Sequence, residues 1–414
     1  MKKSNKLTLY ILVAMLLGAI LGYIINKNYD AVYIEKFSKN IKLLTTIFLR
    51  LVQMIIAPLV FTTLVVGIAK LGDLKTVGRV GGKAMLWFIT ASLMSLLIGL
   101  VLVNVFKPGL GIDLSNADMS GAKDVMGKTQ TFSMLNFVEH VFPKSMFEAM
   151  SNNEILQIVI FSIFFGVAAA AIGDKAKGFI KALETVSLII LKMVGYVMNF
   201  APFAVFGAMT AIIAKQGLGI LSTYAIFIGE FYSGLLILWL LLIFIGFLIL
   251  KKRIFRLVSG LKEPVLLAFS TASSEAAYPK TMLQLERFGC KDKIVSFVLP
   301  LGYSFNLDGS MMYMTFASLF IAQAYGIHLG FEQQLSMLLI LMLTSKGIAG
   351  VPRASLVVIA GTIATFNIPE AGLALLIGID PLLDMGRSAT NVVGNSVATA
   401  VISKWEGELG EPQD

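Results

Sequence analysis

Long apolar segments follow one another along the first 250 residues of the chain. They cover residues 7–25, 43–68, 84–106, 155–172 and 220–250. Each segment is close to, or longer than, the roughly 20 residues that an α-helix needs to cross a bilayer. The pattern predicts an all-α polytopic membrane protein with six crossings up to Leu250.

The first apolar segment follows the basic start MKKSNK, as the core of a signal peptide would. Because no small-residue cleavage site follows it, we expect a retained first helix. A polar insert at 108–153 separates the third and fourth crossings and is expected outside the cell. Pro58 and the run NFAPFAVFG at 199–207 are expected to kink their helices, which needs no functional role.

Beyond Leu250, each apolar run has a polar break at its middle. The breaks are STASSEAAYP at 270–279, SFNLDGS at 304–310, TSKGIAGVPRAS at 344–355 and DPLLDMGRSATNVVGN at 380–395. In hydrocarbon, an unpaired backbone group costs several kcal/mol, so irregular backbone persists only against protein or a watery cavity. Secondary transporters build their substrate sites from paired broken helices. The C-terminal half is therefore typical of a transporter.

The segment that leads into STASSEAAYP is too short to cross a bilayer. As a helix, residues 257–269 would extend roughly 20 Å, which is less than the hydrocarbon core. Two such arms joined at a Ser-rich or Gly-rich tip form a re-entrant hairpin. We favour this interpretation for the first and third breaks over a crossing helix with a loose middle.

Composition supports the membrane interpretation and excludes two classes of site. Hydrophobic residues make up 57% of the chain and charged residues 14%, against about 25% charged in soluble domains. The mean hydropathy is +0.82. The single Cys290 excludes an internal disulfide. The two histidines, His140 and His328, fall in predicted loops and form no metal-ligand cluster.

The net charge of +9 does not indicate nucleic-acid binding, because the basic residues lie in alternate predicted loops. Basic clusters occur in MKKSNK, at 70–83, in DKAKGFIK at 174–181 and in KKRIFR at 251–256. By the positive-inside rule these loops face the cytoplasm, although the lysines of the first outer loop fit the rule less well. We expect a multi-pass protein of the plasma (inner) membrane with both termini in the cytoplasm.

The last predicted helix carries five polar residues on one face. Asp380, Asp384, Arg387, Asn391 and Asn395 are spaced by 4, 3, 4 and 4 residues, which places them within an arc of roughly 80°. A charged side chain at the bilayer centre costs about 2.5–3.5 kcal/mol on insertion scales. A staple between Asp384 and Arg387 would explain only two of the charges. A buried arginine suits a carboxylate, and a nearby aspartate suits an ammonium group or a cation.

Two shorter motifs carry weaker signals. In NLDG at 306–309, Asn306, Asp308 and carbonyls freed by unwinding at Gly309 would suit a small cation, although a capping turn explains the same letters. In GIAGVP at 347–352, a flexible tip would offer free N–H groups to an anion.

The motifs STASSEAAYP, NLDGS, KGIAGVP and IDPLLDMGRSATNVVGN resemble, in order and spacing, those of the dicarboxylate/amino acid:cation symporter family, the glutamate transporter homologues. The likeness covers essentially the whole chain. It implies eight crossing helices, two re-entrant hairpins and a homotrimer. In that family a transport domain moves like an elevator against a rigid scaffold, and the second hairpin is the gate.

The resemblance also implies domain boundaries. The scaffold would comprise residues 1–78 and 108–216, and the transport domain would include helix 3 at 79–107 and helix 6 at 217–254. The remaining units would be the first hairpin at 255–290, helix 7 with the NLDGS break at 291–328, the gate hairpin at 329–370, and helix 8 with the tail at 371–414.

By the same resemblance, Arg387 would bind the side-chain carboxylate of an acidic amino acid and Asp384 its α-amino group. The other implied substrate ligands are Ser273, Ser274 and Asn391 at the α-carboxylate end, Ser310 at the distal carboxylate, Ser388, and Gly350 with Val351 in the closing gate. Family members for C4-dicarboxylates have no aspartate at the position of Asp384. This residue therefore favours glutamate and aspartate over succinate, fumarate and malate.

The implied cation ligands are Ser92, Gly302, Asn306, Asp308, Asn391 and Asn395, with Na⁺ placed at Asn306 and Asp308. Compared with sodium-driven members, Asn395 replaces an aspartate, and Phe88 and Ala91 replace a tyrosine and a threonine. Fewer oxygen ligands weaken the binding of a hard cation. Glu275 in the first tip is the candidate proton carrier, with a solvated tip charge as an equal alternative. Arg353 replaces a small residue and would pair with a cavity acid or reach water.

The sequence therefore predicts a symporter, not an enzyme, that imports acidic amino acids without an organic cofactor. Protons are slightly favoured over sodium as the coupling ion. The alternative is a sodium-coupled C4-dicarboxylate symporter. An ion channel fits less well, because channels repeat a ring of charges by symmetry and this stripe mixes both signs. A hydrolase using Ser273 or Ser274 would lack both a G-x-S-x-G motif and a histidine within the membrane.

Overall fold

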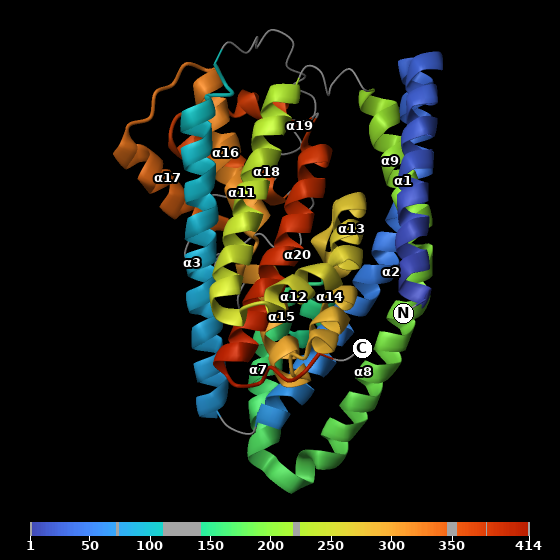
Figure 1. Cartoon of the computed structure of the whole chain (residues 1–414), viewed down its shortest axis with the longest axis vertical. Coiled ribbons are helices and arrows are strands. Elements are labelled where there is room, and N and C mark those ends of the chain that lie inside the picture. The colour runs from blue at the N-terminus through green and yellow to red at the C-terminus, as the bar shows by residue number, and fades with distance from the viewer. Residues whose placement is uncertain are drawn as a thin grey trace.

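The computed structural model describes residues 2–71, 74–110, 142–217, 224–345, 354–377 and 379–412. Within these ranges the regular elements are helices, arranged in two groups that lie side by side (Figure 1). The prediction of an all-α protein is confirmed.

The first group occupies the right side and the bottom of Figure 1 and is built around one long helix. Its members are α1 (Lys2–Asn28), α2 (Ala31–Leu71), α7 (Ile155–Ile172), α8 (Lys177–Val197) and α9 (Ala201–Gln216). The short α6 (Met146–Ser151) precedes α7, and the 3₁₀ turns η1 (Gly173–Ala176) and η2 (Met198–Phe200) flank α8. Helix α2 packs against α7, α8 and α9, and α1 covers α9.

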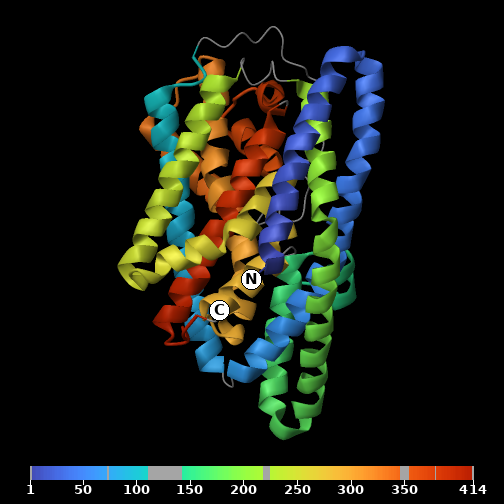
Figure 2. The same cartoon turned by 45° about the vertical axis from the view of Figure 1, so that its right-hand side comes forward.

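The second group surrounds α20 (Asp380–Trp405), the red helix that runs through the middle of Figure 1. Its other members are α3 (Leu74–Phe106), α11 (Ala225–Leu250), α12 (Arg253–Gly260), α13 (Lys262–Thr271), α14 (Ser274–Phe288), α15 (Asp292–Phe305), α16 (Asp308–Ala324), α17 (Phe331–Thr344), α18 (Ala354–Thr365), η4 (Glu370–Leu373) and α19 (Ala374–Ile377). Helices α11, α13, α14, α15 and α16 all pack on α20. Figure 2 shows the same two groups after a 45° turn.

The polar stretch at 270–279 interrupts the chain less than we expected. Helix α13 continues through Thr271, and α14 begins at Ser274. Only Ala272, with the left-handed φ of 51°, and the extended Ser273 are non-helical. Helices α13 and α14 pack against each other as a hairpin. Most of the polar residues of this stretch are therefore helical, and the Thr271 hydroxyl donates to the Leu267 carbonyl of its own helix at 2.7 Å.

The other three predicted breaks had different outcomes. The NLDG break is present, since α15 ends at Phe305 and α16 begins at Asp308. The stretch at 380–395 is not a break, because α20 runs without interruption from Asp380 to Trp405. In the third stretch, residues 346–353 lie outside the described ranges, so the tip between α17 and α18 is not described.

The lengths and compositions of the helices fit a membrane protein. Five stretches of the described chain are long and apolar enough to cross a bilayer: Leu9–Asn28, Ala31–Ala69, Lys75–Phe106, Ile155–Lys215 and Ala225–Leu250. The fourth stretch contains three helices, since α7 ends at Ile172 and α8 begins at Lys177. Pro58 lies inside the continuous α2, whereas the second proline run coincides with a helix start, with η2 ahead of α9.

Candidate functional site

The polar stripe lies on α20, which packs against the broken pair α15–α16 and against the first hairpin, α13–α14. Asp380, Arg387, Asn391 and Asn395 are each at most 4% exposed. Asp384 differs from them, because 37% of its side chain is exposed. Helical spacing alone places the five on one face of α20. Helices α13, α14, α15 and α16 pack on α20, and residues of α16 contact this face.

Arg387 is the centre of a buried charge cluster. Its Nη2 lies 2.9 Å from Asp380 Oδ1 and 2.9 Å from Asp384 Oδ1. The guanidinium also lies over the ring of Tyr313, 4.1 Å from the ring centre, in a cation–π contact. The Tyr313 hydroxyl donates to Asp380 at 3.2 Å, so these two residues, which both contact Arg387, are also bonded to each other. Two carboxylates around one guanidinium keep this charge stable inside the protein.

The guanidinium is nevertheless incompletely satisfied. Its Nε and Nη1 atoms are buried and have no hydrogen-bond partner in the described chain. A buried N–H group without a partner costs about 1–3 kcal/mol, and a charged group costs more. A planar carboxylate is matched to two adjacent guanidinium N–H groups, so a ligand could bond to Nη1 with Nη2, or to Nε with Nη2. The geometry therefore suits a carboxylate ligand at Arg387.

Asn391 connects α20 to the start of α16. Its side-chain oxygen accepts from the backbone N–H of Gly309 at 2.9 Å, and its side-chain nitrogen donates to the Ser310 hydroxyl at 3.1 Å. The first bond satisfies one of the N–H groups that every helix start leaves free. The contact places Ser310 beside the stripe, one helical turn from Arg387.

A second polar cluster, the Asn306 cluster, lies at the Asn306–Leu307 break. Its members are Asn306, Asp308, Asn395 and Ser95. The Asn306 amide donates to Asp308 Oδ2 at 3.0 Å and to Asn395 Oδ1 at 3.2 Å. The Ser95 hydroxyl of α3 approaches Asp308 Oδ1 at 3.4 Å. The Asn306 side-chain oxygen and the Asn395 side-chain nitrogen are buried without partners in the described chain. A carboxylate, an amide oxygen and carbonyls freed at the break form an oxygen-rich site that suits a small hard cation.

Close backbone approach makes this second cluster possible. A Cβ added at Gly394 would collide with Asp308 Oδ2, and one added at Gly302 would collide with Asn395 Oδ1. Any larger residue at these two positions would therefore displace a polar partner of the cluster. The described residues contain no group of three or more His, Cys, Asp or Glu side chains that could hold a metal.

The predicted ligands in α3 lie at the edge of the break. The Ser92 hydroxyl contacts the Phe305 carbonyl at 3.4 Å. Phe88 and Ala91 are buried, and a ring atom of Phe88 would lie 3.6 Å from a Cβ at Gly302. The replaced tyrosine position thus points toward the Asn306 cluster without supplying a hydroxyl.

In the first hairpin, Ser273 and Ser274 each take part in a hydrogen bond that involves the backbone. Ser273 caps α14, because its hydroxyl accepts from the Ala276 N–H at 3.2 Å. The Ser274 carbonyl accepts from the Tyr303 hydroxyl at 3.0 Å. Ser388 is buried on α20. The predicted gate residues Gly350 and Val351, and also Arg353, lie outside the described residues.

Sequence reasoning missed the residues that complete the charge cluster. Tyr313 follows Ser310 by three residues on α16, and this helical spacing was the signal for a shared face. On the far side of α20, the Tyr232 hydroxyl donates to the Leu382 carbonyl at 2.7 Å, and the Trp239 indole donates to the Thr390 hydroxyl at 2.8 Å. Both bonds hold α20 against α11.

Comparisons with known proteins match the chain over almost its whole length. The model of the sodium:dicarboxylate symporter family matches residues 7–405. A proton/sodium-glutamate symport protein of Bacillus caldotenax is 40% identical over 404 residues, which are 97% of this chain and 94% of the relative. A C4-dicarboxylate transport protein of Laribacter hongkongensis is 41% identical over 416 residues, which are 99% of this chain and 91% of the relative. A C4-dicarboxylate transport protein of Bacillus subtilis is 38% identical over 420 residues, or 99% and 96% of the two chains.

Proposed function

The chain belongs to the sodium:dicarboxylate symporter family, and we propose that it imports L-glutamate and L-aspartate into the cell together with cations. The observation that carries the substrate class is the pair of unpartnered, buried N–H groups on Arg387. A ligand carboxylate could satisfy one of them while also bonding to the adjacent Nη2. A neutral substrate would leave them unsatisfied.

Asp384 supports an amino acid over a plain dicarboxylate. It is the partly exposed member of the charge cluster, with 37% of its side chain exposed, so an incoming ammonium group can reach its carboxylate. In the proposed pose, the α-carboxylate end lies near Asn391, Ser273 and Ser274, and the distal carboxylate lies between Arg387 and Ser310. Ser388 borders the same space, and Gly350 with Val351 would close over it.

If sodium is the coupling ion, it would bind at the Asn306 cluster. Asn306 and Asp308 supply oxygens there, and the further proposed ligands are Ser92, Gly302, Asn391 and Asn395. We favour protons over sodium, because Asn395 contributes no negative charge to the cluster and Phe88 and Ala91 contribute no hydroxyl. Glu275 would then carry the proton.

We further propose that the protein works as an elevator. The first group of helices, at 1–78 and 108–216, would form a scaffold and the trimer contacts. The remaining units, assembled on α20, would form the moving transport domain. Eight helices would cross the plasma membrane with both termini in the cytoplasm, and α13–α14 and α17–α18 would be re-entrant hairpins. The start of α1 and the end of α20 lie in the lower half of Figure 1, which supports termini on one side.

The proposed cycle follows from the charges. Without a cation, Asp308 and Asp384 repel an acidic substrate in a site of low dielectric. A bound cation offsets this repulsion, so that substrate and cation bind together. The second hairpin then closes, and the loaded transport domain moves across the membrane.

Uptake into proteoliposomes tests the proposal. Labelled L-aspartate, L-glutamate and succinate are supplied under a proton gradient or a sodium gradient, each with the membrane potential clamped. We expect saturable accumulation of the two amino acids, driven by the proton gradient. A strict sodium requirement would overturn the proton preference, and flux that never exceeds equilibrium would indicate a channel.

A C4-dicarboxylate symporter is the second candidate, because relatives with that name match as well as the glutamate symporter does. The same assay separates the two. Accumulation of succinate in preference to both amino acids would identify the second candidate, and Asp384 would then have another role.

A further inference from the structure

The short helix α12 lies crosswise at the lower end of α11, a helix of membrane-crossing length (Figure 1). Helix α11 ends at Leu250, and Lys251 takes the left-handed φ of 55°, so the chain turns sharply there. Helix α12 then begins at Arg253. A helix that spans the hydrocarbon core ends close to the lipid headgroups. Chain connectivity therefore places α12 at headgroup level, on the side of the membrane that we propose is cytoplasmic.

Helix α12 is amphipathic, and part of its apolar surface is exposed. Ile254 and Leu257 are at most 2% exposed, whereas Phe255 is 60% exposed. The ring of Phe255 lies 6.0 Å from that of Phe247 on α11. The exposed large apolar side chains in the last part of α11 are Leu240, Phe244, Phe247 and Leu248. Phe255 therefore extends an apolar face of a membrane-crossing helix, and such a face meets lipid.

The same segment is strongly basic. Residues 251–262 include no acidic residue, and their basic residues are Lys251, Lys252, Arg253, Arg256 and Lys262. All of these except Arg253 are exposed. Basic side chains beside a membrane surface are attracted to anionic headgroups, and an exposed aromatic ring on the same helix adds apolar contact with the acyl chains. The surface of α12 is therefore complementary to an anionic lipid surface in both charge and apolarity.

Helix α12 is fixed to the second group of helices. It packs on α11, α13, α14 and α20, all of which belong to that group. The Arg253 guanidinium donates to the Gly410 carbonyl at 2.5 Å and lies over the ring of Phe288, 5.4 Å from the ring centre. On the other side, a Cβ added at Gly246 of α11 would collide with Ile254, so the two helices approach closely. Any movement of the second group would carry α12 with it.

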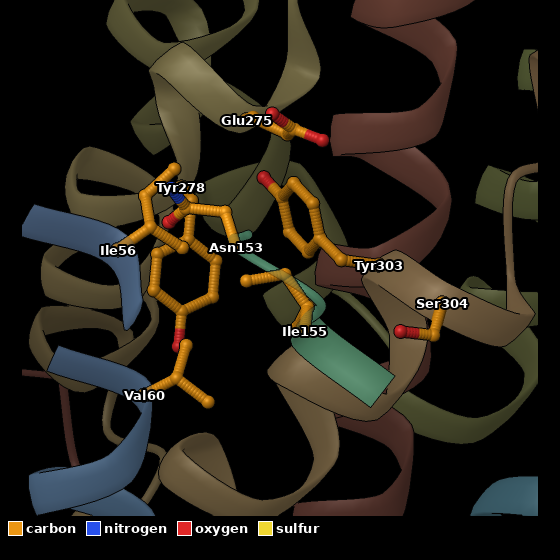
Figure 3. A pocket seen from close by; sticks show the side chains of 8 residues that line it. All are labelled: Ile56, Val60, Asn153, Ile155, Glu275, Tyr278, Tyr303 and Ser304. Atoms are coloured by element: carbon orange, nitrogen blue, oxygen red, sulfur yellow. The ribbon is translucent and has the colours of Figure 1, made fainter. Parts of the chain in front are cut away.

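The boundary between the two groups is packed less completely than the surroundings of α12. A small cavity of ≈ 20 Å³ lies on this boundary, lined by Ile56 and Val60 of α2 and by Tyr278 and Tyr303 of the second group (Figure 3). Glu275 of α14 lines the same cavity. A void removes packing contacts between the surfaces that line it. Incomplete packing here is consistent with the proposed movement of the second group against the first.

We propose that α12 and its flanking lysines are a docking surface for anionic phospholipid headgroups of the cytoplasmic leaflet. Phe255 enters the acyl-chain region, and Lys251, Lys252 and Arg256 contact headgroup phosphates. The inference goes beyond the proposed function and relies on it only for the orientation of α12 and for the movement of the second group. The occupant is a lipid and not a free anion, because the exposed ring of Phe255 continues the lipid-facing side of α11.

Headgroup binding at α12 gives the membrane a way to influence transport. In the arrangement seen here, α12 lies about level with the start of α1, which marks the cytoplasmic end of another membrane-length helix (Figure 1). Movement of the second group along the membrane normal shifts α12 away from this level and breaks its headgroup contacts. Anionic lipid therefore stabilises the present position of the second group, and each transport cycle has to break these contacts.

A spin label at Phe255→Cys tests the lipid contact directly, without transport. The native Cys290 is 3% exposed, so the reagent labels the introduced thiol. The labelled protein is placed in vesicles of equal parts phosphatidylcholine and phosphatidylglycerol. We expect the label to be accessible to oxygen dissolved in the bilayer and shielded from a water-soluble nickel complex. The control is a label at Asp174→Cys, whose side chain is 89% exposed in the turn before α8 and which should show the opposite pattern.

Uptake in vesicles of the two compositions tests the effect on transport. Wild-type uptake should be several-fold slower with phosphatidylglycerol than in phosphatidylcholine alone. The triple variant Lys251→Gln, Lys252→Gln and Arg256→Gln should lose most of this difference. Its matched control replaces three exposed lysines of the first group, which we do not expect to move, by glutamine: Lys175, Lys177 and Lys181. Since anionic vesicles also change ion concentrations at their surface, the result is the difference between variants in the same vesicles.

Three results would overturn the inference. They are a label at Phe255→Cys that is exposed to water, a triple variant whose uptake depends on phosphatidylglycerol as strongly as that of wild type, and slowing of wild-type uptake in neutral vesicles by inorganic phosphate. The third result would assign the surface to a free anion. Failure of the proposed function looks different, because uptake would then be absent in every vesicle while the label at Phe255→Cys still reports contact with lipid.

Discussion

Buried polar side chains find their partners differently in the two groups of helices. In the first group, Thr62, Thr63, Ser162 and Thr210 each donate to the carbonyl four residues earlier in the same helix, at 2.7–2.8 Å. Around α20, Asn391, Asn306 and Tyr313 bond to side chains of other helices or across a break. Among the described residues, fully buried side-chain-to-side-chain bonds occur only in this second group.

This difference separates structural polar residues from a site. A hydroxyl that bonds to its own helix can be removed without leaving another group unpaired, because the carbonyl keeps its helical partner. Removing a residue from the network around α20 leaves its buried partner unsatisfied, which costs about 1–3 kcal/mol. The network is therefore expensive to keep unless a ligand uses it.

Arg387→Lys should have the largest effect on transport. Lysine presents a point charge and cannot offer two parallel N–H groups to a carboxylate. Loss of one partner of a buried charge pair costs about 2–5 kcal/mol, which corresponds to a decrease of roughly 30-fold to several-thousand-fold in kcat/KM for acidic substrates. The measurement is uptake into proteoliposomes. Arg50→Lys, at an exposed position on α2, is the matched control and should behave as wild type.

Gly394→Ala should rank second. The added methyl group would collide with Asp308 Oδ2, and overpacking costs about 1–3 kcal/mol. We expect a lower melting temperature and weaker cation dependence of uptake. The control is Gly195→Ala in α8, where nothing lies within 4 Å of the added Cβ and alanine favours the helix. Equal stability of the two variants would contradict the close approach of α16 to α20.

The sequence predicted those parts of the site whose polar side chains or irregular backbone are costly inside a membrane. Five polar residues at helical spacing are too expensive in an apolar helix to be incidental, so the stripe from Asp380 to Asn395 could be predicted. The NLDG break could be predicted because polar residues interrupt an apolar helix where an irregular backbone is costly. Its place was predicted less well, since the non-helical residues are Asn306 and Leu307 and Gly309 lies inside α16.

The residues that the sequence analysis missed are not costly inside a membrane, so the sequence alone does not single them out. Tyr313 resembles any other aromatic residue in an apolar helix until α20 places Arg387 against its ring. Gly394 resembles other glycines of the chain, and only the approach of Asp308 gives it a role. The short length of the break at 270–279 was also missed: only Ala272 and Ser273 are non-helical, and the Ser270 and Thr271 hydroxyls bond to carbonyls of α13.

Ser310→Ala tests the difference between the two groups of helices by removing a single hydroxyl from the network around α20. It leaves the Asn391 amide without its acceptor at 3.1 Å, so we expect a loss of about 1–2 kcal/mol in stability or substrate affinity. Thr63→Val, in α2, removes a hydroxyl that bonds only to its own helix and should cost under about 0.5 kcal/mol. Thermal unfolding and substrate titration measure both. Equal losses would mean that the two kinds of bond are equivalent.

Asn395→Asp adds a second carboxylate to the Asn306 cluster and so tests whether this cluster binds a cation. A second carboxylate beside Asn306 and Asp308 should strengthen the binding of sodium, since hydrogen bonds and contacts to charged oxygens are about twice as strong as neutral ones. A gain of about 1 kcal/mol corresponds to roughly fivefold tighter sodium binding. Sodium titration of substrate uptake at fixed pH gives the result. A variant without any sodium response would show that the cluster is not a cation site.

The smallest expected effect lies outside the membrane, where Glu406 joins the end of α20 to α3. Its carboxylate accepts from Arg79 Nη2 at 2.9 Å and lies 2.6 Å from Lys83 Nζ. Burial alone would raise the pKa of Glu406, but the hydrogen bonds from Arg79 and Lys83 outweigh it, so the pKa lies below its ordinary value of 4.5. Arg79 and Lys83 are partly exposed, which screens the pair and limits its contribution to about 1 kcal/mol or less.

Glu406→Gln should therefore lower stability slightly at neutral pH, and this difference should disappear in acid. Because folding lowers the pKa of this carboxyl group, its contribution is complete above pH 4.5 and is lost as the pH falls through the lower folded-state value. Glu35, which pairs with Lys215 on the exposed face of the first group, gives the matched control. Both of these side chains are well exposed, so Glu35→Gln should change stability less than Glu406→Gln does. A loss in Glu406→Gln that persists unchanged below pH 4 would mean that packing, and not the ion pair, holds this end of α20.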